Sequence, residues 1–266
     1  MKGVMLKQDL KIEIPVDLKL SSYDFELPDH FIAERPEQKR DECKLLVYSK
    51  SKDQIIHTTF KEIYKYIPEG TCLVKNQTKV LPCRLIGNKS TGAKCEVFIL
   101  GPFGGTKKQN VLIKSSSKKH LHDHFNFPEG LTGKINSIIG DGTFEMEFNL
   151  DGDQFEDYLN QNAKIPIPPY IRGGESDTQD REDYQTIYAA NPGSVAAPTA
   201  GLHFTKEVLD KLESNGVINA NVTLHVGLGT FSPVKVEDLR DHKMHSENFI
   251  VENEEWKKIN SAKNIC

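Results

Sequence analysis

The chain of 266 residues is long enough for one large domain or two modest ones. Its 37% hydrophobic and 27% charged residues argue against a disordered chain. Five cysteines without a C-x-x-C pair argue against a disulfide framework or a zinc knuckle and fit a reducing compartment. No apolar run approaches the roughly 18 residues of a membrane span and residues 1–10 lack an apolar signal core, so we expect a cytoplasmic protein without membrane contact.

The formal net charge of −4 conceals an uneven distribution. Between Cys72 and Asn126 ten lysines and arginines stand against two acidic residues, which makes this segment net +8 and the remainder net −12. Such a cluster suits a phosphate-rich partner, because it raises the local concentration of anions and supplies phosphate contacts. A merely solvated lysine face is the alternative.

The N-terminal part alternates strands and helices. We expect an extended run over Lys11–Val16, a helix over residues 28–33 and a strand over Lys44–Tyr48. A further helix is expected over Thr59–Ile67, where apolar residues have helical spacing.

Residues 72–150 have a different texture of short apolar runs separated by glycine turns, with a strong hairpin signal at Asp141-Gly142. The expected strands are Cys72–Lys75, Val80–Ile86, Cys95–Leu100, Asn110–Ile113, Lys134–Ile139 and Thr143–Phe148. This pattern predicts a small β-barrel or sandwich. Because the flanking regions are typical of α/β proteins, we expect an inserted β domain at residues 73–154 and a main α/β domain at residues 1–72 and 155–266.

After this segment, the proline-rich run Ile165–Ile171 favours extended geometry. Thr205 is expected to cap a helix over Lys206–Ser214, and Val217–Leu228 has the composition of a buried strand. The last helix, Glu252–Lys263, is expected to end without the strand that such a helix usually feeds.

The densest functional signal is the block Asn191–Thr205. Its small residues let the backbone approach a ligand closely, and it leads into a helix N-terminus that can receive a carboxylate or phosphate. Ser194 and Thr199 add hydroxyls, and His203 is a candidate acid or base. A tight connection with a packed histidine is the alternative. Ser–His–Asp hydrolysis is weakly supported, since no G-x-S-x-G elbow surrounds Ser194.

A second block, Thr223–Phe231, is expected to be a strand that ends in a turn with Gly227 and Gly229. Their spacing is not that of G-x-G-x-x-G, so a dinucleotide fold is weakly supported. Ligands of open α/β sheets lie at the carboxyl ends of strands, so this turn is expected to face the site. His225 faces either the ligand or the core.

A third block, His242–Glu247, carries two histidines at i and i+3 followed by a carboxylate. On a helix His242 and His245 would share a face, which suits a metal, a tuned His–carboxylate pair or simple surface polarity. Three alternating histidines are expected to share one face of a strand, where metal, phosphate contact or exposure are the alternatives: His120, His122 and His124.

Taken together, these blocks resemble the S-adenosylmethionine:tRNA ribosyltransferase-isomerase family of queuosine biosynthesis. The resemblance follows family order from near residue 20 to the C-terminus. It is carried by Tyr23–Pro28 (YDFELP), Leu73–Leu85 (LVKNQTKVLPCRL), Ile165–Ile171 (IPIPPYI), Tyr184–Ala189 (YQTIYA), Gly193–Thr205 (GSVAAPTAGLHFT), Leu224–Phe231 (LHVGLGTF) and His242–Glu247 (HKMHSE).

The resemblance implies a main α/β barrel-like domain with an inserted small β-barrel. It implies transfer of the ribosyl part of S-adenosylmethionine to 7-aminomethyl-7-deazaguanine in a tRNA anticodon, which gives epoxyqueuosine and releases adenine and methionine. S-adenosylmethionine is then a co-substrate, tRNA is the partner, and no metal is demanded. We expect a monomer.

Residue roles follow as hypotheses from residue type and block position. Proton transfer is assigned to His203 and His225, with His245 and Glu247 as a supporting pair. The residues expected to contact S-adenosylmethionine are Ser194, Thr199, Gly201, Gly229 and Thr230. Those expected to contact tRNA phosphate are Lys75, Lys79 and Arg84.

The chain departs from the family pattern in two places. Where the family usually has N-D-T-R, it has Asn76–Lys79 (NQTK), which lacks a carboxylate and replaces an arginine fork by a point charge. It also stops at Cys266, where family members continue for roughly another quarter of their length. We therefore expect a truncated protein with weak or no activity alone. The alternatives are a catalytically inactive RNA-binding module and, third, a metal-dependent hydrolase.

Overall fold

The computed structural model describes residues 14–101, 106–140 and 142–266. The chain divides into two compact units, Met1–Ile32 with Ser232–Ser246 and Ala33–Phe231 with Glu247–Cys266. Local apolar patterns do not predict this division. None of the helices in the described part of the chain has the length and apolarity that a bilayer crossing requires.

Where the structure describes it, from residue 14 onward, the smaller unit contains short 3-10 helices and a backbone bridge between Lys19 and Asp238. Its described helices are Val16–Leu18, Leu20–Tyr23, Asp29–Phe31 and Leu239–Asp241. The expected extended run Lys11–Val16 lies mostly outside the described residues. The helix expected over 28–33 is only the turn Asp29–Phe31, because few apolar neighbours pack on it.

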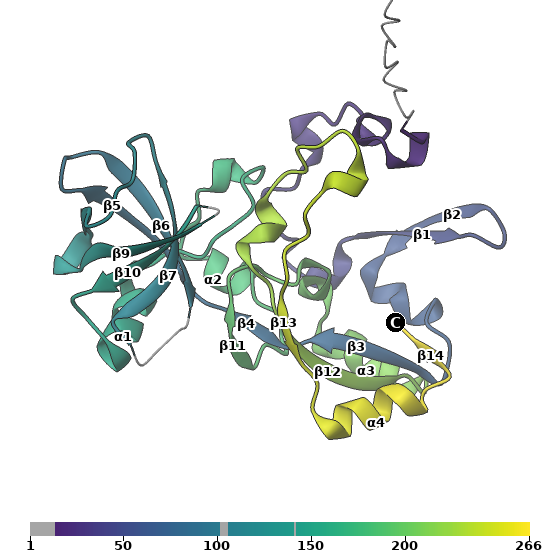
Figure 1. The fold of residues 1–266 in the computed structure, drawn as a ribbon. Coiled ribbons are helices and arrows are strands. Elements are labelled where there is room, and N and C mark those ends of the chain that lie inside the picture. Colours follow the sequence, from purple (N-terminus) through teal and green to yellow (C-terminus); the bar gives the residue numbers. More distant parts are fainter. Residues whose placement is uncertain (1–13, 102–105, 141) are drawn as a thin grey trace, which may run out of the picture. The chain divides into compact units, whose positions relative to one another are not determined.

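The larger unit contains a closed six-stranded barrel (Figure 1). Its strand order is β10-β7-β6-β5-β8-β9, and every neighbouring pair inside that order is antiparallel. The strands are β5 (Arg84–Lys89), β6 (Lys94–Gly101), β7 (Lys108–Ser115), β8 (His124–Asn126), β9 (Thr132–Gly140) and β10 (Thr143–Phe148). Closure pairs the backbone NH and carbonyl groups that the edge strands of an open sheet would leave unpaired.

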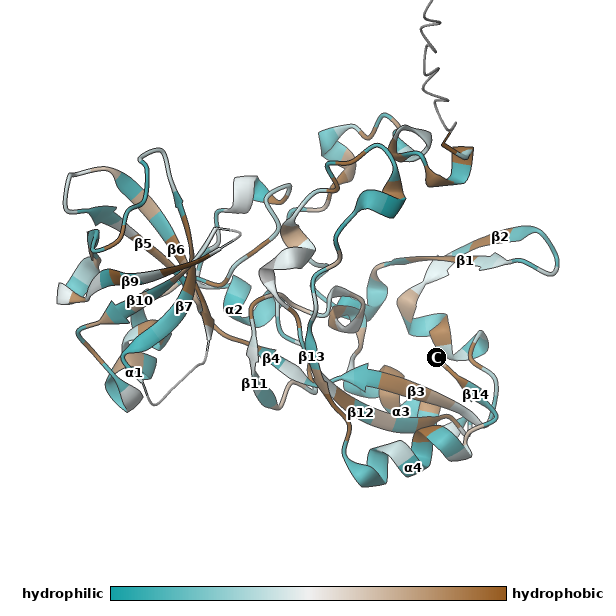
Figure 2. Cartoon of the chain, in the orientation of Figure 1, coloured by the Kyte–Doolittle hydropathy of each residue, from teal (hydrophilic) through white to brown (hydrophobic). Residues whose placement is uncertain are grey.

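The barrel is filled by the inward side chains of its strands. Figure 2 shows hydrophobic and hydrophilic residues mixed along the barrel strands. Helix α1 (Gly152–Asn162) adds Phe155, Tyr158 and Leu159 to the same core. The sequence pattern did not predict this helix, since its polar residues outnumber the three that pack.

The β-barrel itself was predicted, but some of its details were wrong. The expected strand Val80–Ile86 is split into β4 (Thr78–Val80) and β5, because the chain passes from one sheet to another there. The histidines at 120, 122 and 124 do not share a strand face, since β8 begins at His124 and His122 has a φ of 68° in a turn.

A four-stranded sheet in the order β13-β12-β3-β14 carries the functional blocks. Strands β12 and β14 run parallel to β3, and β13 runs antiparallel to β12. The strands are β3 (Thr71–Asn76), β12 (Ile218–His225), β13 (Asn248–Ile250) and β14 (Asn264–Ile265). The expectation that the last helix is followed by no strand was wrong, because residues 264–265 pair with β3.

Two helices accompany this sheet, α3 (Lys206–Ser214) and α4 (Asn253–Ser261). As predicted, Thr205 caps α3, and its hydroxyl accepts a hydrogen bond from the Val208 backbone NH at 3.3 Å. Val208 and Leu212 of α3 pack with Phe60, which lies in the 3-10 helix Phe60–Lys65 where an α-helix was expected.

Two further sheets have two strands each. Strand β1 (Lys44–Ser49), predicted over 44–48, forms a hairpin with β2 (Gln54–Thr59), and β4 pairs in parallel with β11 (Asn191–Ser194). A short helix, α2 (Asp180–Asp183), precedes β11. The block 191–205 therefore begins as a strand and not as a free loop.

Adjacent residues of β5 provide a test of the barrel. Leu85 is 1% exposed in the core, whereas Ile86 is 40% exposed. We expect Leu85→Ala to lower the free energy of unfolding by about 2–5 kcal/mol, because it leaves a cavity. Ile86→Ala, the matched control, should cost less than about 1 kcal/mol in urea unfolding. Equal losses in the two variants would contradict the strand orientation.

Candidate functional site

The side chain of Asn76 joins the carboxyl ends of β3 and β12. Its amide oxygen accepts hydrogen bonds from the backbone NH groups of Leu224 at 3.0 Å and Thr78 at 3.1 Å, and its amide nitrogen donates to the Leu224 carbonyl at 2.9 Å. By donating to and accepting from the Leu224 backbone, this side-chain amide makes the pair of hydrogen bonds that a paired strand residue would make. It therefore fixes where the chain leaves β3 and enters β4.

His225 lies at the end of β12 and contacts Thr78. The distance from its Nδ1 to the Thr78 hydroxyl is 2.9 Å, and that hydroxyl lies 3.5 Å from the Asn191 carbonyl. Gly193 packs against the imidazole, and a Cβ there would lie 2.7 Å from the His225 Cε1. The φ of Gly193, 144°, is also one that favours glycine. The glycine at 193 is thus required for the position of the histidine.

Ser194 connects β11 to the end of β12. The side chain is fully buried at 0% exposure, accepts from the Val226 NH at 2.9 Å and donates to the Ala196 carbonyl at 2.8 Å. Its hydroxyl is therefore occupied by the protein backbone. The proposed contact of Ser194 with S-adenosylmethionine stays a prediction that this geometry does not favour.

Glu247 binds the turn that follows β12. Its carboxylate accepts a hydrogen bond from the Gly227 backbone NH at 2.9 Å. The turn continues into the 3-10 helix Leu228–Phe231, which contains Gly229 and Thr230. Glu247 thus contributes to the shape of the second block and carries a charge at the carboxyl end of β12.

A small open pocket of about 90 Å³ lies where the first and second blocks meet, and we call it the tyrosine–threonine pocket. It brings together Thr199 and Thr230, both exposed and both predicted to contact S-adenosylmethionine. Its lining consists of Pro168, Tyr170, Tyr184, Ala196, Ala197, Thr199, Thr230 and Phe231. The volume is small, so the pocket can hold only part of a molecule the size of S-adenosylmethionine.

Two tyrosines of this pocket come from segments to which the sequence analysis gave no binding role, although both carry the family resemblance. Burial raises the pKa of Tyr184 to about 12. Its hydroxyl therefore stays protonated at neutral pH and can donate a hydrogen bond to a ligand. No role was predicted for Asn76 and Thr78, although both lie in the motif Asn76–Lys79 that carries the family resemblance.

His203 has different neighbours from His225. Its Nδ1 lies 3.2 Å from the Cys43 Sγ, and its ring lies 5.5 Å from that of Phe60. Burial, followed by the positive charge of Arg40, lowers the pKa of His203 below its usual value. The two histidines assigned to proton transfer thus share no described contact, and the catalytic role of His203 stays a prediction.

Gly201 and His245 are placed differently from what their block positions suggest. A Cβ at Gly201 would lie 2.4 Å from the Tyr188 hydroxyl, so this glycine is needed for packing. His245 is exposed in the smaller compact unit, whereas Glu247 belongs to the larger one. Residues 242–247 form no helix before β13, so His242 and His245 do not share a helical face.

The three basic residues predicted to bind phosphate have different environments. Lys79 is exposed on β4, and Lys75 is half-buried with its Nζ 5.0 Å from the centre of the Tyr188 ring. Burial lowers the pKa of Lys75. Arg84 is 4% exposed and forms ion pairs with Glu96 and Glu175. Only Lys79 is thus placed as a surface contact to phosphate requires.

Within residues 14–101, 106–140 and 142–266, no three histidine, cysteine, aspartate or glutamate side chains lie close enough together to share a metal ion.

The comparisons with known proteins agree with these blocks. A family model described as "Queuosine biosynthesis protein" matches residues 20–265, which defines the class of the chain. The chain is 44% identical over 248 residues to the S-adenosylmethionine:tRNA ribosyltransferase-isomerase of Acetivibrio thermocellus. It is 42% identical over 247 residues to that of Carboxydothermus hydrogenoformans. Both alignments cover 92% of this chain and 71% of the relative. The chain belongs to the S-adenosylmethionine:tRNA ribosyltransferase-isomerase family.

Among solved structures, the chain is similar to an S-adenosylmethionine tRNA ribosyltransferase from Thermotoga maritima, with 25% sequence identity and a TM-score of 0.36. That similarity covers 90% of this chain and 64% of the solved chain.

The lowered pKa of His203 predicts a pH dependence of stability. The unfolded chain binds a proton at this residue near about pH 6.5, whereas the folded chain resists it. The contribution of His203 to the free energy of unfolding is therefore fully present above about pH 6.5 and is lost as the pH falls below that value. Urea unfolding between about pH 7.5 and 5 should show a smaller loss of stability for His203→Gln than for the parent. A steeper loss in the variant would contradict the assignment.

Proposed function

We propose that this chain transfers and isomerises the ribosyl moiety of S-adenosylmethionine onto 7-aminomethyl-7-deazaguanine in tRNA, giving epoxyqueuosine-tRNA and releasing adenine and methionine. One observation supports the proposal most strongly: blocks that carry the family resemblance, among them 73–85, 193–205 and 224–231, converge at the carboxyl ends of β3 and β12. This edge is where ligands of open α/β sheets bind. No metal is required for the reaction.

In this proposal His225 acts as the base that takes the proton beside the sulfonium. We assign the Thr78 hydroxyl as a donor to the Asn191 carbonyl, so that it accepts a hydrogen bond from the Nδ1–H of His225. This arrangement selects the tautomer in which Nε2 carries the free lone pair, which is the requirement for a general base. Thr78 is then a positioning residue, because it acts only through the imidazole.

The tyrosine–threonine pocket is proposed to hold one part of S-adenosylmethionine. Thr199, Thr230 and protonated Tyr184 supply hydroxyl groups for the polar atoms of the co-substrate, and the pocket's one proline and two alanines exclude water from it. Gly229 adjoins Thr230 and offers its backbone. Exclusion of water protects a strained intermediate from hydrolysis.

We also propose that residues 73–154 are an inserted domain and that residues 1–72 and 155–266 form a main α/β barrel-like domain. All six barrel strands lie within 84–148. Arg84, at the start of the barrel, forms backbone hydrogen bonds in both directions with Lys164, at 2.9 and 3.1 Å. Exit and return are therefore adjacent, as an insertion requires. We propose a monomer, and a cytoplasmic location because tRNA is the substrate.

The direct test is incubation of the chain with S-adenosylmethionine and tRNA bearing 7-aminomethyl-7-deazaguanine. We expect adenine release and a modified nucleoside with the mass of epoxyqueuosine. The enzyme of Acetivibrio thermocellus serves as the positive control. RNA binding without adenine release, under conditions in which the control reacts, would replace the proposal by an RNA-binding module.

The roles of His225 and Thr78 predict a graded response in single-turnover adenine release. We expect His225→Gln to slow this step by roughly 10²–10⁴-fold, because proton transfer is lost. Thr78→Val should slow it by roughly tenfold, and Thr78→Ser should restore the rate, because a hydroxyl again orients the imidazole. The same adenine-release assay with His203→Ala tests the predicted catalytic role of His203, because a full rate in this variant would reject that role. A full rate in His225→Gln would refute the assignment.

Occupancy of the tyrosine–threonine pocket is tested by calorimetry with S-adenosylmethionine. Thr199→Val and Thr230→Val should each weaken binding by roughly 2- to 10-fold, because each removes one hydrogen bond. Thr132→Val, an exposed threonine on the barrel strand β9, is the control and should bind as the parent does. Unchanged dissociation constants in both pocket variants would place the co-substrate elsewhere.

A further inference from the structure

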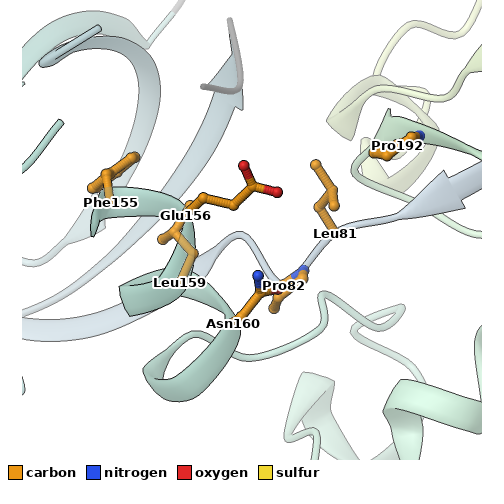
Figure 3. Close-up of a pocket in the computed structure, with 7 residues that line it drawn as sticks. All are labelled: Leu81, Pro82, Phe155, Glu156, Leu159, Asn160 and Pro192. Carbon is orange, nitrogen blue, oxygen red and sulfur yellow. The ribbon is translucent and has the colours of Figure 1, made fainter. Parts of the chain in front are cut away.

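A second open pocket lies between helix α1 and the strands that carry the site, and we call it the proline pocket (Figure 3). It has a cavity volume of about 230 Å³. Its lining consists of Leu81, Pro82, Phe155, Glu156, Leu159, Asn160 and Pro192.

The pocket has an apolar interior and a polar rim. Pro82, Phe155 and Leu159 are buried and form its apolar part, and Leu81 and Pro192 add apolar surface opposite the helix. The rim is polar because Glu156 and Asn160 are one helical turn apart on α1 and both are exposed. Figure 3 shows the Glu156 carboxylate reaching from α1 into the space beside Leu81.

The proline pocket adjoins the proposed catalytic histidine. Pro192 is the residue before Gly193, on which the His225 imidazole packs. Pro192 is also the register partner of Lys79 in the β4–β11 pair, and both residues are exposed. A ligand that contacts Pro192 therefore lies next to Gly193, which packs on His225, and near the exposed Lys79.

We propose that the proline pocket binds the guanine-type base of the RNA substrate, with Glu156 accepting hydrogen bonds from N1–H and the 2-amino group and Asn160 donating to O6. This inference rests on the proposed function and identifies the site of its second substrate. A base that is turned out of a single-stranded loop is read by hydrogen bonds to its Watson–Crick edge and by stacking on apolar or aromatic groups. The prolines and Leu81 supply the stacking surface.

The charge of Glu156 singles out this base. An ionised carboxylate only accepts hydrogen bonds, so it favours a base edge that carries donors. Its negative charge repels RNA phosphates, so binding requires hydrogen bonds from the base that offset this repulsion. Among the four ordinary bases, only the guanine edge presents two adjacent donors, and 7-aminomethyl-7-deazaguanine keeps that edge. Lys79, on the same exposed face as Pro192, supplies the positive charge for the neighbouring phosphate.

The experiment is a cycle of protein and RNA changes, measured as dissociation constants in the absence of S-adenosylmethionine. The probe is an RNA hairpin with 7-aminomethyl-7-deazaguanine in its loop, compared with the same hairpin lacking the 2-amino group of that base. For the parent chain we expect loss of the 2-amino group to weaken binding roughly tenfold. For Glu156→Gln we expect weaker binding of the first hairpin, by roughly 10- to 100-fold, and no further loss with the second.

The matched control is Asp157→Asn, the exposed neighbour of Glu156 that lies outside the pocket lining. It removes the same charge from the same helix, so it should leave binding unchanged or strengthen it through weaker repulsion of phosphate. Both positions are exposed, and thermal melts of the two variants should match that of the parent. Opposite effects of the two variants separate base recognition from general electrostatics.

Three results would overturn the proposal: equal effects of Glu156→Gln and Asp157→Asn, a parent chain that does not distinguish the two hairpins, or a loss in Glu156→Gln that disappears when the aminomethyl group is removed from the base. The last would mean that Glu156 binds the ammonium. The proposed function fails separately, because adenine release is measured without reference to Glu156. Recognition of the base by a chain that releases no adenine would leave the pocket intact and reject the transferase.

Discussion

The arrangement of the site depends on how the chain leaves β3. At that point Asn76 forms three hydrogen bonds, two to Leu224 of the parallel strand β12 and one to the Thr78 backbone. Each such bond contributes only about 1 kcal/mol, but loss of the side chain would leave backbone groups unpaired. Because β4 begins at Thr78, the same contact that closes the sheet also sets the position of the hydroxyl that holds His225.

Small residues in the Asn191–Thr205 block serve packing more than ligand approach. Gly193 makes room for the His225 imidazole, Gly201 for the Tyr188 hydroxyl, and Ser194 is consumed by the backbone at the end of β12. The block thereby holds β11 beside β4 and presents one pocket near Pro192 and another near Thr199. The block therefore sets the spacing of these two pockets.

Charge in the basic segment is partly used inside the protein. Arg84 is bound by Glu96 and Glu175, and Lys89 is buried with Asp123 at 2.7 Å. A buried cation without a partner would be costly, so these carboxylates are structural requirements. The net charge of +8 therefore overstates the positive charge that this segment presents at the surface, whereas Lys79 is exposed on β4.

Much of the fold and the membership of the family could be predicted from the sequence. Alternating apolar residues and glycine turns predict most of the barrel strands, although β8 was not predicted and the expected strand Cys72–Lys75 belongs to the four-stranded sheet as part of β3. Thr205 determines where α3 begins, and contiguous motifs determine the family, because these signals are local. The partners of side chains could not be predicted, because they depend on which distant segments meet. Only the tertiary structure decided that His225 contacts Thr78 while His203 contacts Cys43, that Arg84 is buried, and that Glu156 lies in a pocket with Pro192. These pairings are set by strand register and packing across 36 to 160 residues of sequence, over which no local pattern carries information.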